Sequence, residues 1–280
     1  MIFANQPNYT RNALIPFLNI MAESSPAEIV FSTIEDIARI TLNRPEKLNA
    51  MTQAMTAALI EFVNRCNEDA TVRAVVLTGA GSKAFCAGSD IRDLDTYESA
   101  WSFRNRPDYC DALRRLRKPA ICAINGYCLG GGLELAMACD LRIASETARF
   151  AAPEIKLGWV GGGGMAFSLA HSIGPSNAAW MLLTGDMIDA DTALRWGLIT
   201  EKLTPDRLLE RADQIGRTIA QRPPIAAETA KLNLGAAFTM TREEAIRYER
   251  DLQTICFATE DAVEGRRAFK EKRPATFRGR

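Results

Sequence analysis

The sequence predicts an α/β fold, and two patterns lead to this prediction. Up to about residue 204, short β-branched or apolar runs alternate with amphipathic segments, and the connections between them are short. This rhythm is typical of a sheet covered by helices rather than of separate all-β and all-α blocks. Beyond residue 204 only helical patterns remain. We therefore expect an α/β core over residues 26–203 and a helical region over residues 204–280.

The first 22 residues differ from the rest of the chain. They contain one basic residue, Arg11, and the first acidic residue is Glu23. The stretch resembles neither a secretory signal nor an Arg-rich transit peptide. We interpret residues 1–25 as a peripheral N-terminal extension.

The apolar runs of the core predict strands, beginning with a hairpin that turns at Glu35 and Asp36. The expected strands are residues 29–32, 37–42, 73–77, 120–124 and 141–144. Met55, Leu59 and Val63 recur at helical spacing and predict an amphipathic helix. The expected core helices are residues 52–66, 101–116, 130–139 and 165–172.

The C-terminal region predicts four helices with apolar stripes. They cover residues 205–221, 225–238, 242–257 and 261–271. An apolar stripe has to be buried, either on the chain's own core or against another subunit. The second arrangement implies an oligomer.

Composition excludes several functional classes. Basic and acidic residues both number 34, so no net charge attracts nucleic acid or an acidic membrane. No apolar run approaches the ~20 residues of a membrane helix. The single histidine, His171, excludes most metal and catalytic-triad designs, so we expect no metal. The seven cysteines, an odd number without a C-x-x-C pair, indicate reduced thiols and a cytoplasmic location.

The glycine-rich stretch at residues 161–164 resembles a phosphate-binding loop. It lacks the lysine that accompanies such loops. We interpret these four glycines as a tight turn that opens the helix at residues 165–172.

The strongest chemical signal is a glycine triplet followed by a glutamate. Gly130, Gly131 and Gly132 precede Glu134 at the start of a predicted helix. The first N–H groups of a helix lack intrahelical partners and carry the positive end of the dipole, so they can stabilise a developing oxyanion. Glu134 alone is also explained as a charge that suits a helix start.

Two further segments complete the pattern. In residues 86–90, Gly88 can adopt a left-handed turn that exposes the N–H of Ser89, although Ser89 or Asp90 could instead cap a helix. Glu154 follows Pro153 and has apolar neighbours, so its pKa should be raised if it is buried. Together the segments suggest two N–H donors for an oxyanion and two carboxyls that move protons.

These segments resemble the enoyl-CoA hydratase/isomerase, or crotonase, superfamily. The resemblance runs from about Ile29 to Arg280 and rests on several ordered matches. They are Asn-Arg-Pro-Glu-Lys-Leu-Asn-Ala-Met at residues 43–51, Phe-Cys-Ala-Gly-Ser-Asp-Ile at 85–91, and residues 125–140, 152–158, 183–186, 193–198 and 264–273. The resemblance implies a crotonase-like spiral of repeated ββα units. It also implies that the C-terminal helices assemble a homotrimer, or a hexamer as a dimer of trimers.

The resemblance also implies roles for individual residues. The N–H groups of Ser89 and Gly131 would form the oxyanion hole, and Glu134 and Glu154 would be the catalytic acid and base. The residues implied in CoA binding are Lys47, Leu48, Ala50, Ala87, Asp90, Ile91 and Lys272, the last toward a neighbouring subunit. No separate cofactor is implied, because coenzyme A is part of the acyl-CoA substrate.

The expected activity is reversible addition of water to a 2-enoyl-CoA, giving a 3-hydroxyacyl-CoA. Glutamate at both positions favours hydration, since family members with one acid more often catalyse other thioester reactions. A double-bond isomerase remains an alternative, because it could use the same two carboxyls, and so does another crotonase-type acyl-CoA lyase.

The acyl group stays open at the level of sequence. Trp159 and Met165 stand where many hydratases have other residues and could reshape the acyl pocket. The segment over residues 93–111, which varies in the family, is expected to line the acyl chain.

A non-enzymatic RNA binder is an alternative from another class. Arg114, Arg115, Arg117 and Lys118 form a short basic cluster. Basic residues at a helix end also complement the helix dipole, and the neutral net charge favours this second interpretation. We therefore expect neither a nucleic-acid nor a membrane partner.

Overall fold

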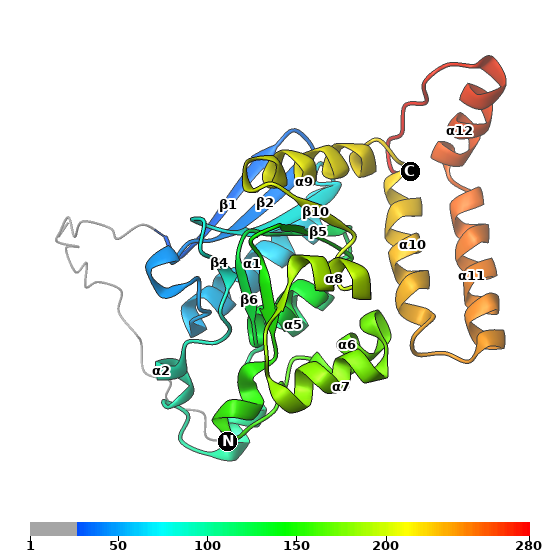
Figure 1. Ribbon diagram of the computed structural model, residues 1–280. Helices are drawn as coiled ribbons and strands as arrows, with labels where there is room; N and C mark the ends of the chain where they lie inside the picture. Colours follow the sequence, from blue (N-terminus) through cyan, green and yellow to red (C-terminus); the bar gives the residue numbers. More distant parts are fainter. Residues whose placement is uncertain (1–26) are drawn as a thin grey trace, which may run out of the picture.

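The computed structural model describes residues 27–280 and contains two sheets (Figure 1). The predicted extension over residues 1–25 lies outside the described residues. The larger sheet has the strand order β1-β2-β3-β5-β7-β10. Its strands are β1 (Ile29–Ile34), β2 (Ile37–Leu42), β3 (Ala74–Gly79), β5 (Ala120–Ile124), β7 (Leu141–Ser145) and β10 (Glu201–Leu203).

The larger sheet is parallel except at its first pair. β1 and β2 form the predicted antiparallel hairpin, and Glu35 takes a left-handed φ of 54° in its turn. β2, β3, β5, β7 and β10 then pair in parallel. Every residue of β3 and β5 is buried, as expected for strands covered on both faces.

Different helices cover the two faces of this sheet. On one face, Leu208 and Ala212 of α9 (Pro205–Ala220) join a core cluster with Val76 and Ile121. On the other, Met55 and Leu59 of α1 (Gln53–Glu68) pack with Leu77 in the main core. Thr52 caps α1 by accepting the N–H of Met55 at 3.0 Å.

The smaller sheet repeats the order of the larger one. It has the order β4-β6-β8-β9, with β4 (Ala84–Cys86), β6 (Tyr127–Leu129), β8 (Arg149–Ala151) and β9 (Ile188–Asp189). Each long strand β3, β5 and β7 is followed by a short strand of the second sheet, and then by helical chain. This repetition confirms the predicted spiral of ββα units.

Residues 101–116 do not form the single helix that we predicted. The segment divides into α3 (Ala100–Arg104) and α4 (Tyr109–Arg114), preceded by α2 (Ile91–Leu94). Pro107 has no N–H to donate, and Asp108 caps α4 by accepting the N–H of Cys110 at 2.7 Å. The chain therefore changes direction between Arg106 and Tyr109.

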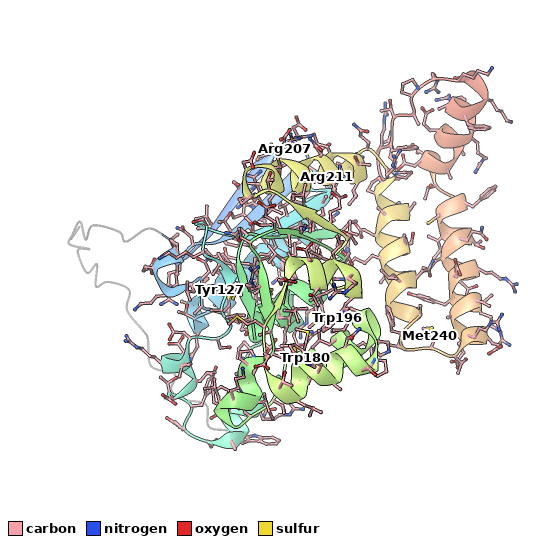
Figure 2. All side chains as sticks on the ribbon, in the orientation of Figure 1. Tyr127, Trp180, Trp196, Arg207, Arg211 and Met240 are labelled. Carbon is pink, nitrogen blue, oxygen red and sulfur yellow. The ribbon has the colours of Figure 1, made fainter. Side chains whose placement is uncertain are left out.

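The remaining helices follow the second sheet. α5 (Gly131–Met137), the 3₁₀ turn η2 (Pro153–Leu157), α6 (Met165–Ile173), α7 (Pro175–Thr184) and α8 (Ala190–Trp196) lie around it. Trp180 of α7 and Trp196 of α8 meet edge to face, with ring centroids 6.1 Å apart (Figure 2). Neither α7 nor α8 was predicted, and the short strands β4, β6, β8, β9 and β10 were not predicted as such.

The C-terminal helices match the prediction closely. α10 (Pro224–Ala236) and α11 (Arg242–Phe257) form a pair that stands beside the body of the molecule, and α12 (Glu260–Glu271) continues away from it (Figure 1). The last residues return, since Asp261 accepts the N–H groups of Arg278 and Gly279 at 2.7 and 2.8 Å. No helix in residues 27–280 is long and apolar enough to cross a membrane.

Candidate active site

Glu134 lies buried on the first turn of α5. Gly130, with φ 54° and ψ −128°, precedes the helix. Glu134 Oε1 accepts two backbone hydrogen bonds, from Gly163 N at 2.7 Å and from Met165 N at 3.1 Å. Gly163 lies in the loop before α6 and Met165 is the first residue of that helix, so this junction fixes the orientation of the carboxylate.

The glycines of residues 161–164 therefore do more than open a helix. Gly164 does precede α6 with a left-handed φ of 102°, as a tight turn requires. A Cβ on Gly161 would lie 2.7 Å from Glu134 Oε1, and one on Gly163 would lie 2.8 Å from Oε2. Side chains at these two positions would displace the carboxylate. Our interpretation of this stretch as a turn was incomplete.

Glu154 lies on η2 in a different environment. It is 9% exposed, and its Oε2 atom is buried without a hydrogen-bond partner in residues 27–280. A Cβ on Gly130 would lie 2.8 Å from Glu154 Oε1. The second carboxyl thus packs against the turn that precedes the helix of Glu134, and one of its oxygens has no hydrogen-bond partner in residues 27–280.

Burial raises the pKa of both carboxyls, but hydrogen bonds oppose this effect differently at the two residues. For Glu134, burial is the main cause, the N–H groups of Gly163 and Met165 oppose it, and the charge of Glu154 adds to it. For Glu154, burial also dominates, and only a hydrogen bond with its own backbone lowers the pKa. The donors on Glu134 favour its charged form, whereas no other residue in 27–280 donates a hydrogen bond to the carboxyl of Glu154.

The predicted oxyanion donors are neighbours. Gly88 takes a φ of 104°, and a Cβ there would lie 3.3 Å from Gly131 N. A Cβ on Gly131 would in turn lie 3.6 Å from Ser89 N. Within residues 27–280, neither N–H donates a hydrogen bond to a backbone acceptor outside regular helices and strands. Asp90, not Ser89, caps α2, by accepting the N–H of Arg92 at 3.2 Å.

Most of the residues implied in CoA binding gather on one side of this site. Ala87 N donates to Leu48 O at 3.0 Å, and Arg44 Nη1 donates to both Ala50 O (2.8 Å) and Asp90 Oδ2 (3.1 Å). Lys47 and Ile91 are exposed next to these contacts. Lys272 is also exposed, but it ends α12 at the far end of the molecule (Figure 1).

A cavity of about 230 Å³ begins at Ser89. It is lined by the start of α1 and by residues of the segment over 93–111 that we expected around the acyl chain. Those residues are Asp93, Leu94, Tyr97, Arg106, Pro107 and Tyr109. Of the two residues that depart from many hydratases, Met165 is buried and Trp159 is 43% exposed.

Tyr109 is the functional candidate that the sequence analysis missed. Its Oη atom lies 3.0 Å from Ser89 Oγ, next to the paired N–H groups. The available signal was an aromatic residue directly after Pro107 and Asp108 in the predicted acyl segment. Because that segment was expected to be one long helix, no single residue in it could be placed.

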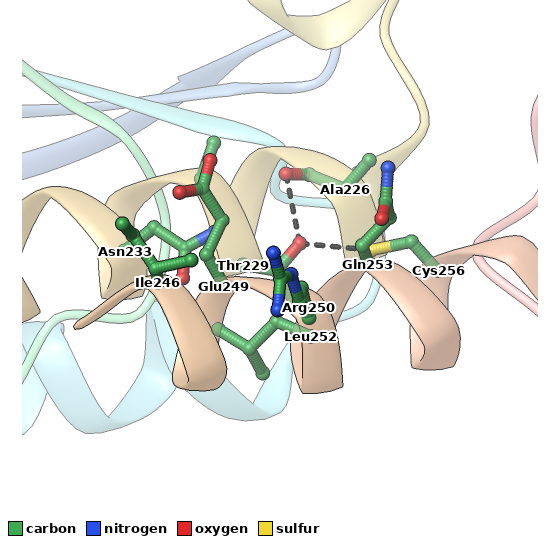
Figure 3. Close-up of a pocket in the computed structure, with 10 residues that line it drawn as sticks. Ala226, Thr229, Asn233, Ile246, Glu249, Arg250, Leu252, Gln253 and Cys256 are labelled. Carbon is green, nitrogen blue, oxygen red and sulfur yellow. Dashed lines mark hydrogen bonds between the residues drawn. The ribbon is translucent and has the colours of Figure 1, made fainter. Parts of the chain in front are cut away.

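A second cavity, of about 330 Å³, lies between α10 and α11 (Figure 3). Thr229 Oγ1 lies 3.0 Å from both Ala226 O and Cys256 Sγ in its wall. Glu249 and Arg250 also line it, but neither of the two buried carboxyls does. Glu134 and Glu154 therefore remain the candidate catalytic pair, and this cavity lies apart from them.

The basic cluster is largely paired within the fold. Glu228 accepts hydrogen bonds from Arg117 at 3.0 Å and from Lys118 at 2.8 Å. Arg114 Nη1 donates to Gly163 O at 2.7 Å and thereby supports the loop on Glu134. These contacts give the cluster structural roles and count against the RNA-binding alternative.

A family model described as enoyl-CoA hydratase/isomerase matches residues 32–280. The chain belongs to this family. The resemblance seen in the sequence is thereby confirmed, over nearly the whole of the described chain.

Similar proteins carry consistent names. The chain is 41% identical over 244 residues to a mitochondrial enoyl-CoA hydratase from Pongo abelii, covering 86% of this chain and 83% of the relative. It is 39% identical over 245 residues to an (E)-benzylidenesuccinyl-CoA hydratase from Thauera aromatica, covering 87% and 96%. A crystal structure of an enoyl-CoA hydratase from Bacillus anthracis superposes with a TM-score of 0.86 at 33% identity, covering 90% of this chain and 100% of that chain. The crotonase-like fold is therefore established.

Proposed function

We propose that this family member hydrates a 2-enoyl-CoA thioester to a 3-hydroxyacyl-CoA, and catalyses the reverse dehydration. The observation that carries the proposal is the pair of buried carboxyls beside two unengaged backbone N–H groups. A thioester carbonyl bound by the N–H groups of Ser89 and Gly131 would become more negative when a nucleophile adds to the conjugated double bond. Donors placed for that charge stabilise the transition state.

The environments of the carboxyls suggest which is base and which is acid. Glu134, whose charged form accepts two N–H donors, would take a proton from water as the water oxygen bonds to C3. Glu154, whose charge is not stabilised, would hold a proton and deliver it to C2 of the enolate. The two steps balance, since one proton leaves water and one reaches carbon. The reaction needs no cofactor beyond the CoA of the substrate.

The acyl group remains open within this proposal. The relatives are named for different substrates, among them crotonyl-CoA and (E)-benzylidenesuccinyl-CoA hydratases. The cavity wall here combines aliphatic, aromatic and basic side chains from one short segment. A panel of 2-enoyl-CoA substrates, from four carbons to aromatic, would define the preference.

Glutamine substitutions test the two acids. Glu134→Gln and Glu154→Gln keep the shape but remove the titrating group, so we expect a ~10²–10⁴-fold loss of kcat from each. The loss of enoyl absorbance measures hydration, and calorimetry with a saturated acyl-CoA measures binding, which should change little. A variant that keeps more than about a third of the activity would remove that residue from the mechanism, on the scale expected of a general acid or base.

An isotope-labelling experiment separates hydration from isomerisation. An isomerase would move a proton from C2 to C4 and convert a 3-enoyl-CoA without adding water. Mass spectrometry after reaction in H₂¹⁸O distinguishes the two, because only a hydratase places the label on C3.

We also propose an assembly and a location. The C-terminal helices expose Leu232, Leu234, Ile255, Phe257, Val263 and Phe269, which supports burial in a trimer or a dimer of trimers. In such an assembly Lys272 could reach the CoA of a neighbouring subunit. The cysteines in the described chain are all unpaired, which supports a cytoplasmic location, and we expect no nucleic-acid or membrane partner.

A further inference from the structure

Tyr109 lies at the point where the oxyanion hole meets the acyl cavity. It is the first residue of α4 and only 8% exposed. Its Oη atom lies 3.0 Å from Ser89 Oγ, and a Cβ on Gly131 would lie only 1.8 Å from that Oη. The hydroxyl therefore occupies the space directly above Gly131, beside both N–H groups of the hole.

The hydroxyls of Ser89 and Tyr109 together have one O–H donor that their mutual hydrogen bond does not use. Ser89 and Tyr109 each carry one O–H, and their mutual hydrogen bond uses one of the two. In residues 27–280, neither side chain has another hydrogen-bond partner. Leaving a buried donor without an acceptor costs free energy, so we expect the bound substrate to supply the acceptor.

Tyr109 is suited to act as that donor at neutral pH. Burial is the main cause that raises the pKa of its phenol, and the nearby Glu134 charge raises the pKa further. The phenol therefore keeps its proton at neutral pH. Ser89 Oγ can donate to Tyr109 Oη, and this arrangement leaves the phenolic hydrogen available.

We propose that Tyr109 is a further catalytic residue, whose hydroxyl donates a third hydrogen bond to the thioester oxygen beside the N–H groups of Ser89 and Gly131. The inference rests on the proposed function of the same site. The Ser89 side chain acts as a positioning group that holds the phenol in place. The arrangement also explains glycine at position 131, since any side chain there would collide with the hydroxyl.

The test combines Tyr109→Phe, Ser89→Ala and the double variant. We expect Tyr109→Phe to lower kcat for trans-2-butenoyl-CoA by ~10²-fold, the scale for one oxyanion donor, with a smaller change in KM. Ser89→Ala should cost a few-fold, because it only loosens the phenol. The double variant should be no worse than Tyr109→Phe alone, since the serine acts through the tyrosine.

A spectroscopic measurement isolates the hydrogen bond from turnover. Bound cinnamoyl-CoA absorbs further to the red when donors polarise its carbonyl. This red shift should be smaller in Tyr109→Phe than in the unmodified protein, at saturating ligand. Thermal unfolding checks each variant, and if Tyr109→Phe does not fold, Ser89→Ala carries the test with the same two readouts.

Several outcomes would overturn the inference. An unchanged kcat and red shift in folded Tyr109→Phe would show that the phenol is not a donor. A lower KM with unchanged kcat in Tyr109→Phe would show that the phenol only occupies the space where the substrate binds. Unchanged kcat and red shift in Ser89→Ala would show that Ser89 does not position the phenol. Failure of the proposed function looks different, since the unmodified protein would then bind acyl-CoA thioesters without hydrating any member of the 2-enoyl-CoA panel.

Discussion

At the scale of single residues, the site contrasts two buried carboxyls. Glu134 is held by two backbone donors, whereas Glu154 Oε2 is buried without a partner. A buried polar atom without a partner costs stability, and such costs concentrate at functional sites. Stability measured against pH can therefore reveal Glu154.

Replacing Glu154 with glutamine should make stability less dependent on pH. Burial raises the pKa of Glu154, so between the unfolded and folded pKa values the folded protein holds one more proton than the unfolded chain. The free energy of unfolding then falls as pH rises through that window. The amide of glutamine does not titrate, so we expect the stability of Glu154→Gln relative to the unmodified protein to increase as pH rises above the ordinary pKa of a glutamate. Urea unfolding at several pH values measures it.

Glu264→Gln provides a control of opposite sign. Hydrogen bonds from Arg273 and Arg267 lower the pKa of Glu264. Its contribution is present above the unfolded pKa and is lost as pH falls through the folded one. The glutamine variant should therefore be less stable than the unmodified protein at neutral pH, with the difference shrinking in acid. Parallel behaviour of the two variants would refute the assignment for Glu154.

The contact between Gly131 and Tyr109 predicts a suppressor relationship. Gly131→Ala should lower the melting temperature, because its Cβ would lie 1.8 Å from Tyr109 Oη. In the Tyr109→Phe background that atom is gone and the closest remaining contact is Cζ at 3.1 Å, so the same substitution should cost less. Calorimetry of the four proteins measures the coupling. Additive losses would mean that the backbone, not the hydroxyl, makes the position intolerant.

At the scale of elements, the glycine loop before α6 holds the carboxylate of Glu134. Gly163→Ala should reduce kcat strongly, since its Cβ would lie 2.8 Å from Glu134 Oε2 and 2.9 Å from Cys110 Sγ. Gly162→Ala is the matched control, because its Cβ would approach only Arg106 Nη2, at 4.0 Å. Steady-state kinetics and circular dichroism distinguish loss of the site from loss of the fold. Equal effects from the two alanines would contradict a specific role for the loop.

The cap of α4 should matter more to activity than a neighbouring cap. Asp108→Ala removes an N-cap, which costs about 1 kcal/mol of stability, and it loosens the helix start that carries Tyr109. Ser99→Ala removes a comparable cap from the exposed helix α3. We expect similar losses in denaturant midpoint but a reduced kcat only for Asp108→Ala. If kcat falls equally in both, α4 has no special role.

Elements differed in how well the sequence revealed them. Long patterned segments such as α1, α11 and β5 were predicted within a few residues, because their apolar spacing is regular. Strands such as β6 and β8 contain three residues each and exist through pairing with each other, which no local pattern reports. Pro107 indicated the break between α3 and α4. We nevertheless predicted one helix, because the residues on both sides of Pro107 have helical spacing.

The candidate site shows the same difference between local patterns and long-range contacts. Glu134, Glu154 and the glycine turns stand in short motifs, so they could be found from the sequence alone. Tyr109 reaches Ser89 across 20 positions of sequence, and Gly163 reaches Glu134 across 29. Such contacts depend on the packing of segments that approach only in the folded chain.

At the scale of the whole molecule, the exposed apolar side chains of the C-terminal helices favour a homo-oligomer. Phe269 of α12 is 86% exposed, which is unfavourable for a large apolar side chain unless a partner covers it. Phe269→Asp should shift sedimentation from a trimer or hexamer toward smaller species. Lys270→Asp places the same carboxylate on an exposed neighbour without removing apolar surface. A stable monomer in the unmodified protein, or equal effects from both variants, would contradict the proposal.

The layout of the chain also bears on how such an enzyme acquires new substrates. The carboxyls and N–H groups follow strands β4, β6 and β8, whereas much of the cavity that we propose for the acyl chain comes from one continuous stretch, residues 91–114. If the proposed roles hold, exchange of that stretch between homologous genes would alter acyl preference while leaving Glu134 and Glu154 in place. Tyr109 makes one exception, because it extends from the exchangeable stretch to Gly131. A productive recombinant would have to inherit positions 109 and 131 as a compatible pair.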